Sequence, residues 1–291
     1  MKEPLFCGVA TAIVTPFIHN EIDFRAVERI LDAQVEAGVQ AVVVTGTTGE
    51  ASTLSIAEKS ELWRFVCNYL KGCIKVIVGV GTNDTTASVL QSKIAQECGA
   101  DALLVVTPYY NKCSQDGLVA HYSAIADATE LPLIAYNVPS RTGLNLLPQT
   151  CKRLSDHPNI AGVKEASGNI SQISKILSLC NHFPLWSGND DQIVPIMSMG
   201  GLGVISVLSN ICPKAVVEMT EACLNNDYPS AAKMQLRYLP LIEALFSDVN
   251  PIPVKEAMCQ LGICSRELRL PLTPLSAQKR LLLTEAMNMC N

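Results

Sequence analysis

Several features that mark particular classes of protein are missing from this sequence. Its twelve cysteines are scattered singly, without a CxxC pair or a Cys/His cluster at zinc spacing. No basic run stands out and the net charge is −5, which argues against nucleic acid or an anionic membrane as partner. No apolar run approaches the roughly 18 residues of a membrane span. We therefore predict no metal site, no nucleic-acid partner and no membrane segment.

The cysteines and the N-terminal residues bear on the compartment. Scattered, unpaired cysteines are typical of reduced thiols, which predicts a cytoplasmic protein. Residues 1–17 include a short apolar run that resembles a weak signal peptide. Pro4 and Pro16 break that run and only one lysine precedes it, so we favour the cytoplasmic interpretation.

An alternation of strand and helix patterns predicts the fold. The chain has 291 residues and 48% hydrophobic composition, enough for a sizeable core. Short β-branched runs recur, and several are almost continuously apolar, as in strands buried on both faces. Predicted strands lie at 8–14, 41–45, 75–80, 102–107, 131–137, 160–164, 184–188 and 203–207. This pattern predicts the α/β class and a closed (β/α)8 TIM barrel, with an open doubly wound sheet as the alternative.

Amphipathic segments separate the predicted strands. Helices are expected at 24–37, 55–70, 85–98 and 116–128. Ser55 and Glu58 have the spacing of a capping box at the start of one of them. Gly38 and Gly99 each stand where a helix gives way to a strand.

The strand signal stops after about residue 210. Segments 212–225, 228–247, 253–261 and 276–289 are predicted to be helical, and the first of them closes the barrel. We therefore divide the chain into a barrel at 1–225, which carries the active site, and a C-terminal helical region at 226–291.

Lys164 is the most unusual residue of the predicted strands. It ends an apolar strand, although lysine is almost never fully buried without a partner. Active sites of such barrels lie at the C-terminal ends of the strands. Desolvation there lowers a lysine pKa to about 7–8 and yields a neutral amine that forms a Schiff base with a ketone. Small Gly162, two residues earlier on the same face, is expected to leave room for the side chain. The alternative is a strand-end lysine that extends to solvent.

Two residues near the end of the preceding strand point to the same place. Tyr136 could exchange protons with a substrate bound to Lys164, or could be an ordinary aromatic core residue. Arg141 follows in a Pro/Ser/Gly loop, where its guanidinium suits a carboxylate. A loop arginine paired to a surface acid is the alternative for Arg141.

Four loops at the same end carry further polar groups. GTTGE at 46–50 offers hydroxyls and free amides for an anion, although taken alone it favours an ordinary turn between strand and helix. TPYYN at 107–111 has two adjacent tyrosines that suit a binding edge, a subunit contact or a packed loop. SGNDD at 187–191 and GVIS at 203–206 could present amides to a carboxylate, or could be simple turns.

Taken together, these motifs resemble the dihydrodipicolinate synthase family, within the pyruvate-dependent class I aldolases. The resemblance runs from the N-terminal GVATAIVTPF through the barrel and rests on motifs in the family's order and spacing. They are GTTGE at 46–50, TPYYN at 107–111, YNVPSRTG at 136–143, GVKEASGN at 162–169 and GVISV at 203–207.

The resemblance implies an activity and four catalytic residues. The family condenses pyruvate with L-aspartate 4-semialdehyde to 4-hydroxy-tetrahydrodipicolinate, on the route to diaminopimelate and lysine. Lys164 would form the Schiff base and Tyr136 would transfer protons. Thr47 would link Tyr136 to Tyr110, which in this family comes from the neighbouring subunit.

The resemblance also implies the binding residues and the assembly. Thr48 and the backbone of Ile205 would hold the pyruvate carboxylate, beside Gly188. Arg141 would bind the carboxylate of the semialdehyde. No metal or diffusible cofactor is expected, because the lysine iminium is itself the electron sink. A homotetramer built from tight dimers is expected.

Other functions stay open at this point. Sibling aldolases, such as N-acetylneuraminate lyase and the 2-keto-3-deoxy or 4-hydroxy-2-oxo acid aldolases, share the lysine, the tyrosine and a loop like GTTGE. Arg141 and the Glu165-Ala166 pair favour the synthase. A non-catalytic barrel that binds a keto acid is the alternative from another class.

Family members that L-lysine inhibits bind it at the tight dimer interface, near segments that here read EASTLSIAEK and GTNDTTAS. This chain keeps Asn83 and Tyr109 there. Where sensitive members carry histidines and a glutamate, it has Ile56, Lys59 and Ala87. We therefore expect weak or absent inhibition, unless Glu50 or Asp84 supplies the missing acceptor.

Overall fold

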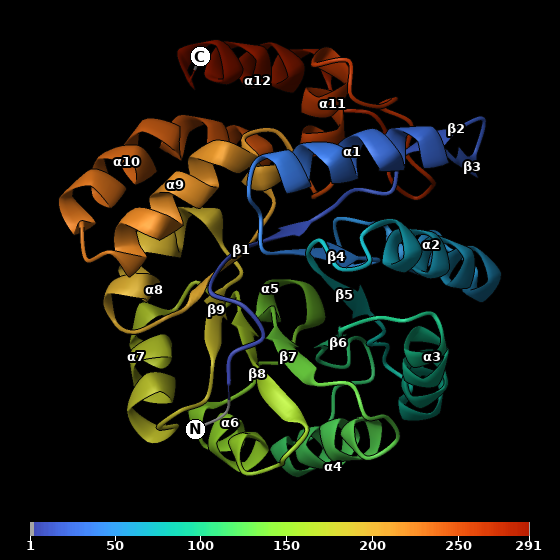
Figure 1. The fold of residues 1–291 in the computed structure, drawn as a ribbon, viewed down its shortest axis with the longest axis vertical. Coiled ribbons are helices and arrows are strands. Elements are labelled where there is room, and N and C mark those ends of the chain that lie inside the picture. Colours follow the sequence, from blue (N-terminus) through green and yellow to red (C-terminus); the bar gives the residue numbers. More distant parts are fainter. Residues whose placement is uncertain (1–2, 291) are drawn as a thin grey trace.

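The structure is a computed structural model that describes residues 3–290, so the outermost residues of both predicted regions lie outside it. Eight parallel strands form a closed barrel in the order β1-β10-β9-β8-β7-β6-β5-β4 (Figure 1). The predicted TIM barrel is confirmed and the open doubly wound sheet is wrong. The strands are β1 Gly8–Ala12, β4 Ala41–Val44, β5 Lys75–Gly79, β6 Ala102–Val106, β7 Leu133–Asn137, β8 Ile160–Glu165, β9 Leu185–Ser187 and β10 Gly203–Ser206.

The predicted helices between the early strands are all present. They are α1 Phe24–Glu36, α2 Ile56–Tyr69, α3 Thr85–Glu97 and α4 Gln115–Ala126. Ser55 and Glu58 form the predicted capping box at the start of α2. Gly38 and Gly99 have φ angles of +77° and +88° just after α1 and α3, the left-handed conformation that glycine adopts most easily. Local sequence chemistry therefore sets these helix ends.

Several short elements carry no periodicity long enough to be predicted. They are the hairpin of β2 Phe17–Ile18 and β3 Glu21–Ile22, and the helices α5 Pro139–Thr142, α6 Pro148–Ser155, α7 Ile170–Leu179 and α8 Ile193–Ser198. Among them α5 matters most for function, because this single turn carries Arg141 at the mouth of the barrel.

The C-terminal quarter is helical, as predicted. It contains α9 Pro213–Leu224, α10 Tyr228–Leu245, α11 Ile252–Gln260 and α12 Ala277–Cys290. In Figure 1, α9 lies in the ring around the barrel, while α11 and α12 stand beyond α1 at the edge of the molecule. The boundary at 225/226 falls between α9 and α10 and stays a prediction as a division into domains. The region after it is not independent of the site, because the turn before α11 reaches the barrel mouth.

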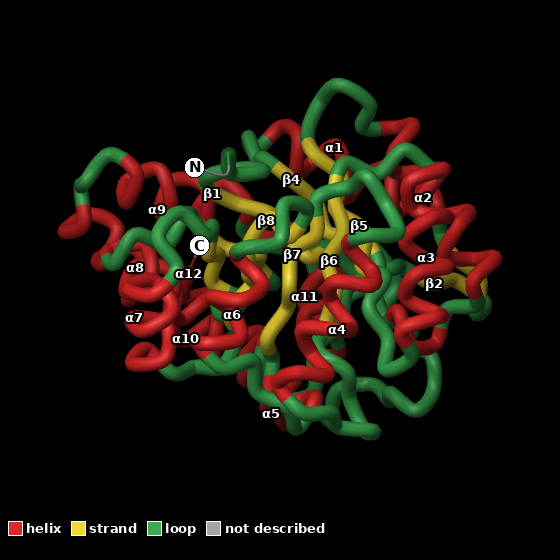
Figure 2. Tube along the Cα trace, turned by 90° about the horizontal axis from the view of Figure 1, so that it is seen from below, coloured by secondary structure: helices red, strands yellow, loops and turns green. Residues whose placement is uncertain are grey.

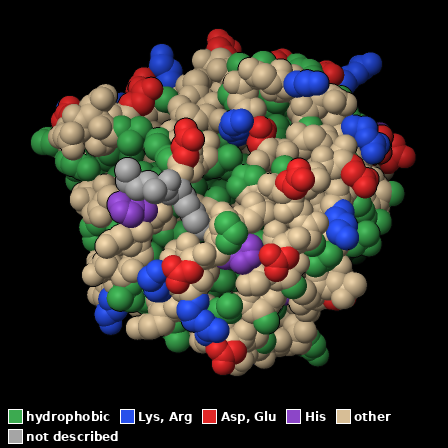
Figure 3. Space-filling view, turned by 60° about the horizontal axis from the view of Figure 1, so that its bottom comes forward, with side chains coloured by type: hydrophobic (Ala, Val, Ile, Leu, Met, Phe, Trp, Pro, Cys, Tyr) green, Lys and Arg blue, Asp and Glu red, His purple; other side chains and the backbone are tan. Residues whose placement is uncertain are grey.

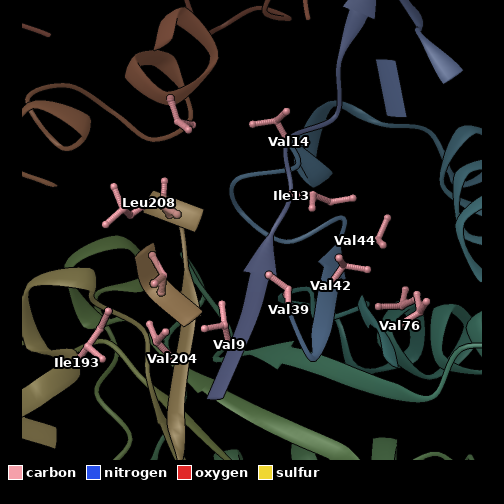
Figure 4. Packing of buried hydrophobic residues seen from close by; sticks show 14 of the residues in the cluster. Val9, Ile13, Val14, Val39, Val42, Val44, Val76, Ile193, Val204 and Leu208 are labelled. Atoms are coloured by element: carbon pink, nitrogen blue, oxygen red, sulfur yellow. The ribbon is translucent and has the colours of Figure 1, made fainter. Parts of the chain in front are cut away.

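Alternating strand residues divide the core into two clusters. Side chains such as Val9, Val42 and Val204 belong to the cluster that packs the strands against the helices (Figure 4). Residues of the other set, including Ile134 and Ile205, fill the barrel interior. Tube and ribbon views place the strands inside and the helices around them (Figure 2). The filled interior leaves room for chemistry only at the ends of the strands.

On the face that Figure 3 displays, acidic and basic side chains are interspersed and neither sign dominates. This agrees with the modest net charge of −5. Across residues 3–290, no helix combines the length and apolar character that crossing a membrane requires.

A buried ion pair ties the GTTGE loop to the C-terminal region. Glu50 adopts a left-handed backbone conformation with φ of 52° and pairs with Lys255 of α11 at 2.5 Å, with both side chains essentially inaccessible. The Lys255 amine also donates to the carbonyl of Glu267 and lies 4.2 Å from the ring centroid of Phe17. The backbone amide of Arg269 donates to the second oxygen of Glu50. These contacts fix the loop that carries Thr47 and Thr48.

We predict that Lys255→Met destabilises the protein by about 3–5 kcal/mol, because it leaves the Glu50 carboxylate buried without a cation. Lys279→Met is the matched control. Its pair with Asp248 is 38% and 30% exposed, so the loss should stay within about 1 kcal/mol. Urea unfolding measures both changes. Equal losses in the two variants would contradict this account of the pair.

Candidate active site

A cavity of about 170 Å³ opens at the C-terminal ends of the barrel strands. Its lining combines Thr47 and Thr48 after β4, Tyr136 of β7, Lys164 of β8 and Gly188 after β9. A second cavity of about 250 Å³ lies beside it. The two share Gly46, Thr47, Leu104, Tyr136, Val138 and Arg141. We call them the inner and the outer cavity. The inner cavity gathers most of the predicted site residues in one place.

Lys164 is 6% exposed, and its amine lies 4.4 Å from the ring centroid of Tyr136. Burial lowers the pKa of the amine to about 7; the negative charge of Asp190 opposes this shift, and the positive charge of Arg141 adds to it. Within residues 3–290 no carboxylate forms an ion pair with Lys164. About half of the amine is therefore neutral at pH 7, and Lys164 lines the inner cavity. The alternative of a lysine extended to solvent is wrong.

Room for the Lys164 side chain comes from Gly188 rather than from Gly162. A Cβ atom at Gly188 would lie 2.6 Å from the Cβ of Ala166 and 3.1 Å from the Cε of Lys164. A Cβ at Gly162 would instead meet the carbonyl of Pro184 at 2.4 Å and the ring of Trp186 at 2.7 Å. The expectation for Gly162 was wrong because β9 packs its own residues into that space.

Tyr136 stands next to Lys164 in the barrel, since the two residues are paired in the register of β7 and β8. Burial raises the pKa of the phenol, while the charge of Arg141 and a hydrogen bond from Thr47 lower it. The hydrogen bond between Tyr136 and Thr47 is a contact that the predicted proton relay requires, and the relay itself stays a prediction. Tyr136 belongs to the interior cluster and also lines both cavities. It is therefore a core residue, and its role in proton transfer stays a prediction.

Thr48 and Arg141 are joined through Asn250, a residue of the C-terminal region. The side-chain amide of Asn250 donates to the Thr48 hydroxyl at 2.9 Å, and Arg141 donates to the Asn250 carbonyl at 3.4 Å. In the described part of the chain, no acid pairs with Arg141, so the alternative of a surface ion pair is wrong. Arg141 lines both cavities, and its guanidinium has no carboxylate partner among the described residues that would compete with an anion.

Two predicted site residues lie outside both cavities. Ile205 is fully buried in β10, in register with Ala10 of β1, and its side chain belongs to the barrel interior. Tyr110 is 90% exposed and has a φ of 70°, a strained conformation for a tyrosine. Its neighbour Tyr109 lines the outer cavity instead. The roles expected for Ile205 and Tyr110 stay predictions.

Sequence reasoning missed three residues of this site. Asn250 and Phe246 line the inner cavity from the C-terminal region, about 200 residues along the chain from the GTTGE loop. The only local signal was the Asn-Pro turn, which indicates no position in the fold. Asp190 lies within the SGNDD motif, but the burial of its carboxylate behind the cavity depends on the loop after β10.

Comparisons with known proteins point to one family. The model of the dihydrodipicolinate synthetase family matches residues 5–289. The 4-hydroxy-tetrahydrodipicolinate synthase of Caldicellulosiruptor saccharolyticus is 50% identical, over 98% of this chain and 97% of its own. The solved dihydrodipicolinate synthase of Thermotoga maritima is 43% identical, with a TM-score of 0.97 and coverage of 98% and 99%. A structure described as a monomeric dihydrodipicolinate synthase variant has the same identity and TM-score, with coverage of 98% and 97%.

We predict that Gly188→Ala displaces Lys164, because the added methyl group would lie 3.1 Å from its Cε and 2.6 Å from the Cβ of Ala166. Overpacking of this kind costs typically about 1–3 kcal/mol. The variant should fold, as judged by circular dichroism, and should show a slower reaction of Lys164 with small carbonyl compounds. An unchanged rate would mean that the backbone shifts to accept the methyl group without displacing Lys164, and would contradict this prediction.

Proposed function

Because the chain belongs to the dihydrodipicolinate synthetase family, we propose that it condenses pyruvate with L-aspartate 4-semialdehyde to give 4-hydroxy-tetrahydrodipicolinate. The observation that carries the proposal is the Lys164 amine, which is buried, without an ion-pair partner among the described residues, and has a pKa of about 7. Such an amine is a nucleophile for a keto acid at neutral pH.

The first half of the reaction forms a cationic iminium. The neutral Lys164 amine attacks the ketone carbon of pyruvate, and the nitrogen loses a proton as the C–N bond forms. The former carbonyl oxygen gains protons and leaves as water. No metal or diffusible cofactor is required in this proposal, because the iminium draws electrons from the neighbouring methyl group and makes its protons acidic.

The second half forms a carbon–carbon bond and closes a ring. Loss of a methyl proton converts the iminium into an enamine, whose carbon attacks the aldehyde carbon of the semialdehyde. The aldehyde oxygen takes up a proton and becomes the product hydroxyl. The amino group of the semialdehyde then attacks the iminium carbon, displaces Lys164 and regenerates the free amine.

Proton transfer is assigned to Tyr136, Thr47 and Tyr110. The contact between the Lys164 amine and the Tyr136 ring, and the hydrogen bond between Tyr136 and Thr47, support this assignment. Tyr110 lines neither the inner nor the outer cavity and is 90% exposed, which suits a residue that completes the site of a second subunit.

Substrate binding is assigned to the groups that surround these residues. Thr48 and the backbone of Ile205 hold the pyruvate carboxylate, and Gly188 keeps the space beside Lys164 open. Arg141 binds the carboxylate of the semialdehyde, which the absence of an acidic partner within residues 3–290 supports.

The assembly and the compartment complete the proposal. We infer a homo-oligomer in which the exposed Tyr110 enters the partner's site, and a tetramer built from two such dimers. A monomeric variant among the structural relatives makes the assembly a matter for direct measurement. All twelve cysteines are free thiols, which supports a reducing, cytoplasmic environment.

The proposed chemistry predicts that pyruvate with borohydride leaves one reduced adduct per chain, on the peptide that carries Lys164. Lys164→Ala should fold normally and lose nearly all turnover of pyruvate and the semialdehyde, because no other lysine within residues 3–290 lines the inner cavity. Peptide mass spectrometry locates the adduct. An adduct on Lys152 or Lys175, or none at all, would overturn the proposed function.

The assignment of Arg141 predicts a selective effect on the second substrate. Arg141→Ala should raise the KM for aspartate semialdehyde far more than the KM for pyruvate, because removing one partner of a charge-assisted pair costs roughly 2–5 kcal/mol. Initial rates with each substrate varied in turn measure the two constants. Equal effects on both would count against this role.

The region that binds lysine in sensitive relatives supports weak inhibition here. Among the described residues, the outer cavity is lined by Lys59 and Arg141 and by no carboxylate. The Lys59 amine already donates to Gln91 at 3.1 Å. Glu50 is committed to Lys255, and Asp84 caps α3 by accepting from the Thr86 amide. Glu50 is therefore not free to take the ammonium of an added lysine, and Asp84 does not line the outer cavity.

We therefore predict that L-lysine inhibits only above about 1 mM, an affinity weaker than about 4 kcal/mol. A lysine titration of initial rates at saturating pyruvate measures this. Half-inhibition well below that concentration would show that other groups supply the acceptors for the ammonium.

A further inference from the structure

Asp190 is a buried acid whose two carboxylate oxygens have different environments. It begins the short 3-10 helix Asp190–Gln192 after β9 and is 1% exposed. Its Oδ2 accepts hydrogen bonds from the amides of Val207 and Leu208 at 3.0 Å and 2.9 Å, and Ser206 adds a side-chain hydrogen bond. Its Oδ1 has no hydrogen-bond partner in the part of the chain that the structure describes. One oxygen is anchored and the other is unused.

This carboxylate lies directly behind the inner cavity. Gly188 and Asn189, which precede it, line the cavity with Lys164, and so does Val207, which donates to it. Gln235 of α10 holds the Asp190 backbone carbonyl at 2.8 Å. The loop after β10 therefore holds the carboxylate of Asp190, and the C-terminal region holds its backbone.

Three groups set the charge balance around the Lys164 amine. The aromatic ring of Tyr136 lies beside it, Arg141 disfavours its positive charge, and Asp190 is the acid that favours it. Burial raises the pKa of Asp190, while the hydrogen bonds to its carboxylate and the charge of Lys164 lower it and favour the charged form. The buried Lys164 amine can release a proton and become neutral. The iminium formed on it stays positively charged. A buried cation without a nearby negative charge is costly.

We propose that Asp190 is a positioning residue that serves as the fixed counter-charge for the cationic iminium on Lys164. This inference rests on the proposed function. Anchored through Oδ2, the carboxylate needs no rearrangement when the positive charge develops, which is the condition for effective electrostatic stabilisation. It touches neither substrate, since it lies behind the cavity lining.

The test replaces the charge with an isosteric amide, in Asp190→Asn. Pyruvate and borohydride are applied over a range of pyruvate concentrations and pH, and the fraction of chains reduced on Lys164 is measured by mass spectrometry. The pyruvate concentration for half-trapping should rise roughly tenfold, since the iminium loses its counter-charge. The acidic limb of the pH profile should move to lower pH, because the ammonium form of Lys164 loses the same support.

Asp191→Asn is the matched control, because Asp191 is the next residue on the same short helix and its side chain is exposed. It should behave as the unmodified protein does in both measurements. A structural role of Asp190 alone would lower the melting temperature and leave the pH limb in place, which would contradict the proposal. Asp190→Ala, which leaves no buried amide, should give the same two shifts.

The outcomes separate this inference from the proposed function. If the unmodified protein is not trapped by pyruvate, the proposed function fails. If it is trapped and the Asp190 variants share its pH limb and its half-trapping concentration, only the counter-charge role is wrong. Failure of both Asp190 variants to fold would assign the residue a purely structural role and would also overturn the inference.

Discussion

Desolvation of one amine is the constraint on which the site depends. Lys164 lies at the end of an almost fully apolar strand, and β7 and β9 on either side leave it no ion-pair partner within residues 3–290. Water would keep the amine charged and unreactive, whereas the barrel mouth lowers its pKa to about 7. The same low-polarity setting makes the cationic iminium costly. A fixed carboxylate behind the cavity, that of Asp190, would lower this cost.

The rest of the fold holds polar groups at set positions around this amine. The GTTGE loop would be free at the barrel rim, yet Glu50 is fixed by Lys255 of α11 and by the amide of Arg269. Asn250 then joins the Thr48 hydroxyl to the C-terminal region. The helices beyond the barrel therefore act as a frame for the site. The C-terminal helices are therefore part of the structure that holds the site, and not a separate appendage.

The sequence predicted best what depends on local pattern. Apolar runs such as 102–107 and 160–164 became strands, and the Ser55–Glu58 spacing became a capping box, because both effects need only near neighbours. Lys164 and Tyr136 were found because an ionisable residue at the end of a buried strand is chemically conspicuous. Contacts made across the fold could not be read this way. The space that Trp186 takes beside Gly162 and the reach of Asn250 to Thr48 depend on packing between distant segments.

The most direct test of this account is the titration of Lys164 itself in the unliganded protein. Competitive labelling with a small acylating reagent, followed by peptide mass spectrometry, gives the rate of modification of Lys164 as a function of pH. Burial at the barrel mouth predicts an apparent pKa of about 7 for this lysine. The exposed Lys152 and Lys175 serve as internal references in the same digest. A titration of Lys164 at the ordinary lysine value of about 10.4 would contradict the claim that desolvation makes it a nucleophile.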